Sequence, residues 1–265
     1  MKKVLTIAGS DCSGGAGIQA DLKTMLANGV YGMSVITSLT AQNTTGVRSI
    51  QNATGDFLKD QIDSVFEDIV PDAVKTGMIP SKEMVEIIAE RMKFYNVKKL
   101  VIDPVMVATS GADLSNSESV KALKEKLIPL AALVTPNVPE AEVLSGMKIN
   151  AEDDMKNAAE KINKECGCSV LIKGGHSEEN ANDVLYHDGE FYVFAMKKID
   201  NENTHGTGCT LSSAIACNLA KGMDVPQAVT RAKEYITEAI TAGLDLGRGR
   251  GPLDHGHDLK TKYKI

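Results

Sequence analysis

The segment Val4-Leu5-Thr6-Ile7-Ala8-Gly9-Ser10-Asp11 opens the chain with an apolar run that stops at two polar residues. Five similar apolar runs follow it, and amphipathic stretches with helical spacing separate them. Continuous apolar runs are typical of strands that are covered on both faces. Because strands and helices alternate, we expect right-handed crossovers and a mostly parallel sheet between two layers of helices. The later runs are residues 35–39, 73–76, 100–102, 133–135 and 170–172, and the helical stretches are 16–26, 55–69, 81–93, 117–127 and 153–164.

The last third of the chain adds a hairpin and two more helices to this pattern. Residues 184–199, with Asp188-Gly189 in the middle, predict a β-hairpin added to the sheet, which either pairs across a homodimer or caps the sheet. Leu211, Ala214, Ile215 and Leu219 share one face of a helix, and residues 226–244 form another. No linker, internal repeat or low-complexity tract interrupts the sequence, so we predict one domain over residues 1–265.

The composition argues against several classes of protein. The net charge of −6 and the pI near 5.5 argue against nucleic acid as a main partner, because phosphate backbones attract clustered Lys and Arg. No apolar run approaches the roughly 20 residues of a membrane helix, and the first run is too short for a signal peptide. Five cysteines without framework spacing indicate reduced thiols and a cytoplasmic protein.

Polar residues or glycines come directly after most of the apolar runs. In open parallel sheets, ligands bind at the carboxyl ends of the strands, so these residues should gather around one site. The sequence therefore predicts a ligand site along this edge of the sheet. The residues are Ser10-Asp11, Gln42-Asn43, Asp103-Pro104, Pro136-Asn137 and Gly174-Gly175.

The sharpest local signal is Asn203-Thr204-His205-Gly206-Thr207-Gly208-Cys209-Thr210, which runs straight into the Leu211 helix. Glycines let the backbone approach a ligand, and a helix start offers unpaired N–H groups and a positive dipole end, so the segment is suited to bind an anion. An ordinary glycine turn before a core helix is the alternative. Cys209 lies in the first turn, where the pKa of a thiol is lowered, and it acts as a general base or shapes the pocket, with a small buried core cysteine as the alternative.

Other motifs in the sequence do not support rival sites. Gly-x-x-x-x-Gly-Lys-Ser/Thr is missing, and the glycines of Ser13-Gly14-Gly15-Ala16-Gly17 have the wrong spacing for a dinucleotide site. Cys166 and Cys168 lack the second pair that a zinc site needs. We interpret His255-Gly256-His257 as a solvated tail rather than a metal site.

Seven motifs occur in one order along almost the whole chain, from Leu5 to Pro252. They are Gly14-Gly15-Ala16-Gly17-Ile18-Gln19-Ala20-Asp21, Thr40-Ala41-Gln42-Asn43-Thr44, Lys75-Thr76-Gly77-Met78, Asp103-Pro104-Val105-Met106, Thr135-Pro136-Asn137-Val138-Pro139-Glu140, Lys173-Gly174-Gly175-His176 and the 205–209 stretch. In this combination the sequence resembles the ribokinase superfamily, and within it the bacterial hydroxymethylpyrimidine/phosphomethylpyrimidine kinases of thiamine biosynthesis.

The resemblance implies a ribokinase-like three-layer α/β/α sandwich and a kinase that uses ATP and Mg²⁺. It implies phosphorylation of 4-amino-5-hydroxymethyl-2-methylpyrimidine and then of its monophosphate. Asn137 and Glu140 would organise Mg²⁺, largely through water, although a helix cap explains both residues as well. Lys173 and Asp103 would contact the nucleotide, with a solvated strand end as the alternative for Lys173. Gly206, Thr207, Gly208 and Cys209 match the family's anion hole.

The resemblance also places the substrate ring. Gln42 offers one acceptor and one donor to an amino group beside a ring nitrogen, a pairing that pyridoxal lacks. Residues 105–111 should form a flap, and Ala108 stands where one branch of pyridoxal kinases has an aldehyde-capturing cysteine. A pyridoxine/pyridoxal kinase is the main alternative, and a non-catalytic pyrimidine sensor is a second. The further pocket residues are Gly9, Ala16, Asp21, Met78 and Val105, although Asp21 and Asp11 would equally suit caps and Met78 the core.

Overall fold

The computed structural model describes residues 1–106, 117–174, 182–195, 199, 201 and 203–260. Within these residues, one sheet runs in the order β3-β2-β1-β4-β5-β6-β7-β8-β9. Its central strands are parallel, and antiparallel pairing joins β3 at one edge and β8 and β9 at the other. The strands are β1 (Lys3–Asp11), β2 (Tyr31–Asn43), β3 (Gly46–Asn52), β4 (Ala73–Thr76), β5 (Leu100–Ile102), β6 (Leu133–Val134), β7 (Ser169–Ile172), β8 (Asp183–His187) and β9 (Glu190–Phe194).

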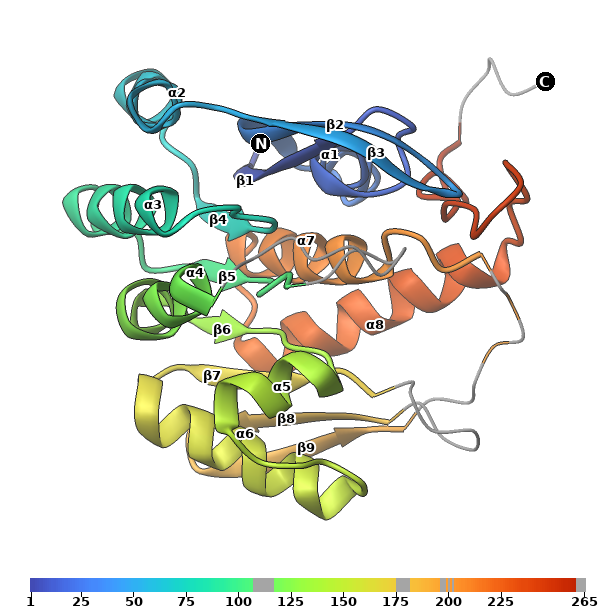
Figure 1. The fold of residues 1–265 in the computed structure, drawn as a ribbon. Coiled ribbons are helices and arrows are strands. Elements are labelled where there is room, and N and C mark those ends of the chain that lie inside the picture. Colours follow the sequence, from blue (N-terminus) through green and yellow to red (C-terminus); the bar gives the residue numbers. More distant parts are fainter. Residues whose placement is uncertain (107–116, 175–181, 196–198, 200, 202, 261–265) are drawn as a thin grey trace.

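Helices cover both faces of the sheet, which confirms the predicted three layers (Figure 1). One hydrophobic core joins the sheet to α2–α6, and a second joins it to α1, α7 and α8. The first face carries α2 (Gly55–Asp68), α3 (Lys82–Phe94), α4 (Ser117–Ala122), α5 (Val138–Ser145) and α6 (Glu152–Cys166), and the second carries α1 (Gly17–Ala27), α7 (Thr207–Ala220) and α8 (Val225–Thr241).

Side-chain caps fix where several helices begin, close to the predicted starts. Thr54, Ser81 and Asp224 each accept a hydrogen bond from the backbone N–H three residues later, and so satisfy donors that the helix leaves unpaired. Helix α7 differs from these helices because it begins at a glycine, Gly206, whose side chain offers no cap. Its first-turn donors are therefore open to another partner.

Helix α7 lies on the sheet between α1 and α8, and every residue from Thr210 to Ala220 is buried. Most of these residues are small, so the helix packs closely against β1, β4 and β5. A helix that is buried all round is held in position by packing on every side. Its N-terminus is therefore a fixed part of the site at the carboxyl ends of the strands.

Two predicted elements differ from the structure. Strand β2 runs on to Asn43 and pairs with β3, which has mostly exposed residues and lacks the continuous apolar run used to find strands. The helix expected over residues 117–127 splits into α4, a π-helical turn (Leu123–Leu127) and a 3₁₀ turn (Ile128–Leu130). Pro129 has no N–H to continue a helix, which fits the change at this point.

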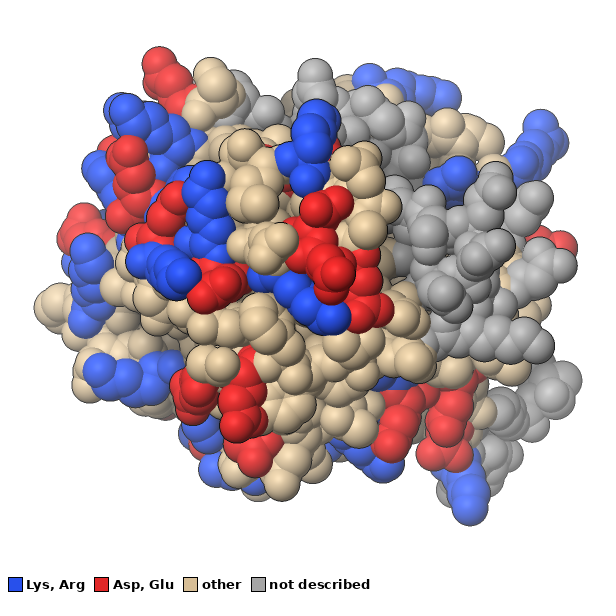
Figure 2. Space-filling model, turned by 90° about the horizontal axis from the view of Figure 1, so that it is seen from below, with Lys and Arg blue, Asp and Glu red and all other residues tan. Residues whose placement is uncertain are grey.

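The surface carries charges of both signs. On the face in Figure 2, Lys and Arg side chains alternate with Asp and Glu side chains instead of gathering into one basic stripe. Nucleic-acid binding needs such clustered positive charge, so this face does not provide it. Among the described residues, no helix is both long enough and apolar enough to span a bilayer.

Candidate active site

A cavity of about 920 Å³ opens at the carboxyl ends of the parallel strands. Residues that end or follow β1, β2, β4, β5, β6 and β7 line it, together with the start of α7. This is where the sequence pattern placed a ligand site. Of the predicted site residues, the cavity is lined by Gly9, Ala16, Gln42, Met78, Asp103, Val105, Asn137, Glu140, Lys173, Gly206, Thr207, Gly208 and Cys209.

The predicted anion hole is a tight turn that ends in free amides. Gly206 has φ of 86°, and a side chain there would collide with the carbonyl of Gly15, so only glycine fits. The Thr207 N–H donates to Thr204 O at 3.2 Å. The N–H groups of Gly208 and Cys209 have no hydrogen-bond partner within the described part of the chain. Two donors at the positive end of α7 therefore face the cavity.

The pKa of Cys209 differs from the prediction. Burial raises the pKa of this thiol to about 11, and this effect outweighs the nearby Lys75 ammonium and the backbone hydrogen bond from Gly17, which lower it. The expected lowering by the helix end is therefore wrong. Without ligands the Cys209 side chain is a protonated thiol at neutral pH rather than a ready thiolate base.

Next to the turn, Lys173 and Asp103 form a buried ion pair. Lys173 Nζ lies 2.9 Å from Asp103 Oδ1, and the two side chains are 14% and 3% exposed, so Lys173 is not a solvated strand end. A side-chain carbon at Gly208 would lie 3.3 Å from both Asp103 Oδ2 and Lys173 Nζ, which places the pair directly beside the turn.

Asn137 and Glu140 form a capping box at the start of α5. Glu140 N donates to Asn137 Oδ1 at 2.9 Å, and Asn137 N donates to Glu140 Oε2 at the same distance. Burial raises the pKa of Glu140, which Lys173 opposes and Asp103 reinforces. The helix-cap alternative is thus confirmed, and the cap still leaves the Glu140 carboxyl on the cavity wall.

The prediction that Asp21 binds the substrate is wrong. It does not line the cavity but is fully buried in an ion pair with Lys75, whose Nζ lies 2.8 Å from Asp21 Oδ2. Thr6 and Ser213 donate to its carboxylate at 2.6 and 2.7 Å. The Asp21 carboxylate therefore makes its hydrogen bonds to groups inside the protein, and these bonds hold β1, β4 and α7 together.

The glycine-rich loop after β1 is organised by Asp11. Its carboxylate accepts hydrogen bonds from the amides of Ser13, Gly15 and Ala16 and from His205 Nε2 at 2.9 Å. Asp11 therefore caps a turn, as one of the two sequence interpretations held. His205 is a site residue to which the sequence assigned no role. Nothing in its surroundings in the sequence reveals a partner 194 positions away.

Gln42 projects from the end of β2 into the same cavity. Its carboxamide lies 3.2 Å from Thr40 Oγ1 and 3.4 Å from His205 Nε2. Met78 is 9% exposed, and its terminal methyl would lie 2.9 Å from a side-chain carbon at Gly9. Gly9 therefore leaves room that Met78 fills, so that Met78 belongs to both the core and the cavity wall.

The far wall of the cavity contains residues that the sequence did not assign to the site. Leu211, expected only as a core residue of its helix, and Ile236 contribute apolar surface. Lys233 Nζ pairs with Asp183 Oδ2 at 2.6 Å beside Gly174, and Arg250 lies at the rim. These residues come from α7, α8, β8 and the segment after α8, and no sequence motif connects them.

The C-terminal segment is not the solvated tail that the sequence suggested. His255 is 5% exposed, and Thr210 Oγ1 lies 2.9 Å from its Nε2. Burial, with Lys23 nearby, lowers the pKa of His255 to about 4, which keeps the ring neutral. The segment therefore packs on the first turn of α7. Among the described residues, no group of three or more His, Cys, Asp or Glu is arranged to hold a metal.

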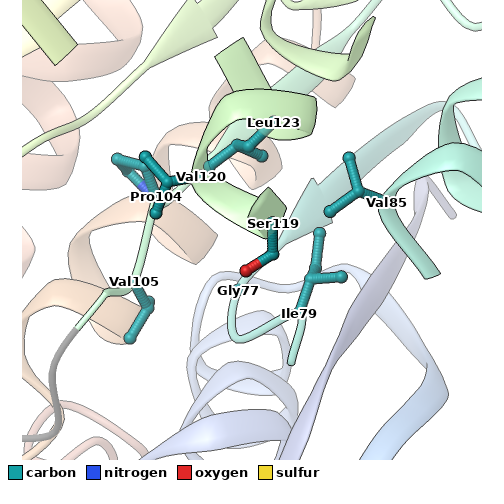
Figure 3. Close-up of a pocket in the computed structure, with 8 residues that line it drawn as sticks. All are labelled: Gly77, Ile79, Val85, Pro104, Val105, Ser119, Val120 and Leu123. Atoms are coloured by element: carbon teal, nitrogen blue, oxygen red, sulfur yellow. The ribbon is translucent and has the colours of Figure 1, made fainter. Parts of the chain in front are cut away.

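A second, much smaller hollow of about 10 Å³ lies behind Val105 (Figure 3). Figure 3 shows it enclosed mainly by apolar side chains, including Ile79, Val85 and Leu123. A space of this size is about that of one water molecule, so it holds no substrate. Val105 lines both hollows and Met106 lines the larger one, while residues 107–111 of the predicted flap lie outside the described residues.

Comparison with known proteins links this site to a family. The family model described as phosphomethylpyrimidine kinase matches residues 11–254. The chain is 47% identical over 255 residues to the hydroxymethylpyrimidine/phosphomethylpyrimidine kinase of Bacillus subtilis, covering 96% of this chain and 94% of that protein. It is 51% identical over 253 residues to the thiamine biosynthesis bifunctional protein ThiED of Geobacter sulfurreducens. That match covers 95% of this chain but 52% of the relative, so the chain spans about half of its length.

Solved structures support the same assignment. The crystal structure of a Clostridium difficile phosphomethylpyrimidine kinase is 50% identical and superposes with a TM-score of 0.82, covering 91% of this chain and all of that chain. An ADP complex of Bacillus subtilis pyridoxal kinase is 42% identical, with a TM-score of 0.90 and coverage of 97% and 98%. With these identities, this fold and a family match over most of its length, the chain belongs to the phosphomethylpyrimidine kinase family, whose fold is ribokinase-like.

Proposed function

We propose that this chain is an ATP-dependent kinase that phosphorylates 4-amino-5-hydroxymethyl-2-methylpyrimidine and then its monophosphate, in thiamine biosynthesis. One observation carries the proposal beyond family membership. A single cavity has free amides and the Lys173–Asp103 pair at one place and the Gln42 carboxamide at another. The first group suits a migrating phosphoryl group, and the second suits the amino edge of a pyrimidine.

The phosphoryl end of the site works by electrostatics. In phosphoryl transfer, negative charge spreads over the oxygens of the migrating group, and the protein's main task is to position and stabilise that group. The amides of Gly208 and Cys209 supply fixed donors, and the positive end of α7 adds to them. Lys173, held beside this turn by Asp103, adds a full positive charge that needs no rearrangement when the reaction occurs.

The residues around Glu140 fit a magnesium ion. Mg²⁺ prefers oxygen ligands, keeps several waters and is held by one or two carboxylates plus substrate phosphates. Asp103 and Glu140 both line the cavity, and burial with a neighbouring carboxylate makes ionisation of Glu140 unfavourable until a cation arrives. We propose that these two carboxylates, with Asn137, hold Mg²⁺ largely through water. When bound, the ion would neutralise charge on the phosphates of ATP.

The protonated thiol of Cys209 changes its proposed role. In a loose transition state the attacking hydroxyl keeps its proton until late, so a strong base is not needed at the start. The thiol lies in the turn that receives the phosphoryl group and shapes the place where the hydroxyl attacks. We therefore assign Cys209 to positioning the alcohol rather than to accepting its proton, because a neutral thiol cannot take up a second proton.

A pyridoxine/pyridoxal kinase is the second candidate, since solved pyridoxal kinases resemble this chain closely in structure. Two residues favour the pyrimidine. Gln42 offers an acceptor and a donor that pyridoxine cannot use fully, because its ring has no exocyclic amine. Ala108, which lies outside the described residues, has no thiol with which to capture the pyridoxal aldehyde.

The second phosphorylation requires the cavity to accept a substrate that already carries a phosphate. Of the Lys and Arg residues on the described cavity wall, Lys173 and Lys233 form ion pairs with Asp103 and Asp183. Arg250 at the rim has no such carboxylate partner among the described residues. We propose that Arg250 attracts the extra negative charge of the monophosphate.

One substrate-panel assay tests the function. ADP release is measured with the aminopyrimidine alcohol, its monophosphate and pyridoxine, each with ATP and Mg²⁺. Release with the first two in preference to pyridoxine supports the proposal, and preference for pyridoxine supports the second candidate. Tight binding of the pyrimidine without any ADP release would indicate a sensor. We place the reaction in the cytoplasm, where the five free cysteines stay reduced, while a homodimer remains a prediction.

A further inference from the structure

The side-chain amide of Gln42 contacts Thr40 and His205. Each of these residues accepts only one end of the amide, either the oxygen or the NH₂ group, as its neighbour. In the structure Oε1 lies 3.2 Å from Thr40 Oγ1, and Nε2 lies 3.4 Å from His205 Nε2. The two ends of a carboxamide have almost the same shape, so the surrounding donors and acceptors decide which end belongs where. The other hydrogen bonds of Thr40 and His205 show whether each residue presents a donor or an acceptor to Gln42.

Thr40 has its only proton engaged elsewhere. Its Oγ1 lies 2.8 Å from the carbonyl oxygen of Ser10, which can only accept a hydrogen bond. The hydroxyl therefore donates to Ser10, and only its lone pairs remain for Gln42. A group that faces these lone pairs has to be a donor, which is the NH₂ end of the carboxamide.

His205 requires the opposite end. Its Nε2 lies 2.9 Å from Asp11 Oδ2, deep in the protein. Burial opposes ionisation of Asp11, but hydrogen bonds from His205, Ser13 and Ala16 hold the pKa of its carboxyl below the ordinary value. A carboxylate only accepts, so His205 Nε2 carries a proton. This single proton is directed mainly at Asp11, and a protonated Nε2 has no lone pair, so it cannot accept from an NH₂ group. The end of the Gln42 amide that lies 3.4 Å away therefore has to be the oxygen, which shares the same N–H.

We propose that Thr40 and His205 lock the Gln42 carboxamide with Nε2 toward Thr40 and Oε1 toward His205, so that both residues set ring specificity by positioning Gln42. One N–H of Nε2 and one lone pair of Oε1 remain for the substrate. Given the proposed function, on which this step rests, an amino group beside a ring nitrogen matches them in one direction only. The amino group then lies at the His205 end and the ring nitrogen at the Thr40 end.

The lock has a consequence for analogues of the substrate. A 4-oxo pyrimidine presents a carbonyl and a ring N–H on the same edge, which reverses the donor and the acceptor. A locked carboxamide cannot turn to meet this edge. Its oxygen would therefore face the ring carbonyl, and its NH₂ group would face the ring N–H, so no hydrogen bond would form. A carboxamide that is free to turn would accept either ring. The preference for the amino ring over the oxo ring therefore reports the lock itself.

The experiment compares kcat/KM for the aminopyrimidine alcohol and its 4-oxo analogue in the full chain. The wild type should prefer the amino ring by at least about a hundred-fold, because a site built for hydrogen bonds rejects a mismatched edge. In Thr40→Val combined with His205→Leu, the preference should shrink about ten-fold, while the KM for ATP stays unchanged. His205→Gln, whose side-chain NH₂ can donate to Asp11 and to Gln42, should keep the preference. His257→Gln, away from the cavity, is the matched control.

Each outcome decides one question. Equal loss of activity toward both rings in the double variant would show that the two residues only support the fold, and would overturn the lock. A preference that survives in the double variant but disappears in Gln42→Leu would also overturn it, while leaving the proposed function intact. A wild type that phosphorylates neither ring with ATP would instead reject the proposed function.

Discussion

Lys75 Nζ lies 2.8 Å from Asp21 Oδ2 in the interior, and neither side chain has any exposed surface. Thr6 and Ser213 donate to the same carboxylate, so the lysine and two hydroxyls leave the carboxylate well satisfied. Removing one member of such a pair strands the other charge without water, which costs far more than the pair contributes by itself. This cluster joins β1 and β4 to α7, whose first turn forms the anion hole.

Asp21→Asn should therefore destabilise the protein by about 3–5 kcal/mol, because the Lys75 ammonium loses its counter-charge in a place that water does not reach. Urea unfolding followed by circular dichroism measures the change. Asp72→Asn is the control, since Asp72 pairs with Lys2 at the surface and should cost less than about 1 kcal/mol. If both variants lost the same free energy of unfolding, burial of the ion pair would not explain the cost of removing Asp21.

His255 should make the protein sensitive to mild acid. Its folded pKa of about 4 lies below the ordinary 6.5, so the unfolded chain binds a proton more readily than the folded one. The stability that depends on neutral His255 is complete above about pH 6.5 and falls as the pH drops toward 4, by roughly 3 kcal/mol in total.

His255→Gln can still accept from Thr210 but does not titrate, so its stability should change less between about pH 7 and 4.5. Urea midpoints at the two pH values give the difference from the wild type. His257→Gln serves as the control because His257 pairs with Glu238 near the surface. If wild type and His255→Gln lost stability in parallel, another group would have to be the acid-sensitive one.

Much of the fold could be predicted because the central strands are covered on both faces. Such strands need continuous apolar runs, and these runs alternate with helical stretches along the sequence. Strand β3 escaped prediction because it lies at the edge with mostly exposed residues. The π-helical turn over Leu123–Leu127 also escaped, because its own residues have ordinary helical periodicity and Pro129, which cannot continue a helix, comes only after them.

The position of the site followed from topology, but its electrostatics did not. Residues at the carboxyl ends of parallel strands have to meet at one edge, which placed Gln42, Asp103 and Lys173 together. The ion pair of Asp21 and the raised pKa of Cys209 depend on burial, which a motif does not report. The contact between His205 and Asp11 joins residues from opposite ends of the chain, and neither has a periodic pattern that points to the other.

Gly208→Ala should impair catalysis without unfolding the protein. The added methyl would lie 3.3 Å from both Asp103 Oδ2 and Lys173 Nζ, so this pair has to shift by a few tenths of an ångström. We expect kcat to fall about ten-fold or more, because a small displacement of charges aimed at the phosphoryl group weakens transition-state stabilisation. Gly256→Ala, whose methyl would meet only ordinary contacts at 3.6 Å, should keep full activity. Steady-state kinetics and thermal melts of both variants separate catalysis from folding.

Cys209 should react slowly with alkylating reagents near neutral pH. Its pKa of about 11 leaves only a small fraction of thiolate, and the rate should rise about ten-fold per pH unit below that value. Cys12 is exposed and should be alkylated first, as peptide mass spectrometry would show. The same reasoning predicts that kcat of the wild type does not climb steeply between about pH 7 and 9. A tenfold rise per pH unit in kcat that disappears in Cys209→Ala would show that a thiolate base limits the rate.

Glu140 should link magnesium to stability. Burial raises its folded pKa above that of the unfolded chain, so the folded state becomes less stable as rising pH ionises the carboxyl. A cation beside Glu140 would offset this cost, and binding to the folded state alone stabilises it by about 2.7 kcal/mol at a hundred times the dissociation constant. Adding Mg²⁺ to the ADP-bound wild type should therefore raise Tm, and more so at about pH 8 than at pH 6.

In Glu140→Gln the same addition should raise Tm much less, since the amide keeps the cap on Asn137 N–H but has no charge to offer. Without Mg²⁺ this variant should be at least as stable as the wild type at about pH 8, because no buried carboxylate has to ionise. Its kcat should fall about ten-fold or more, as the ion is held less well. Glu142→Gln on the exposed side of α5 is the control. An equal effect of Mg²⁺ on Glu140→Gln and the wild type would place the ion elsewhere.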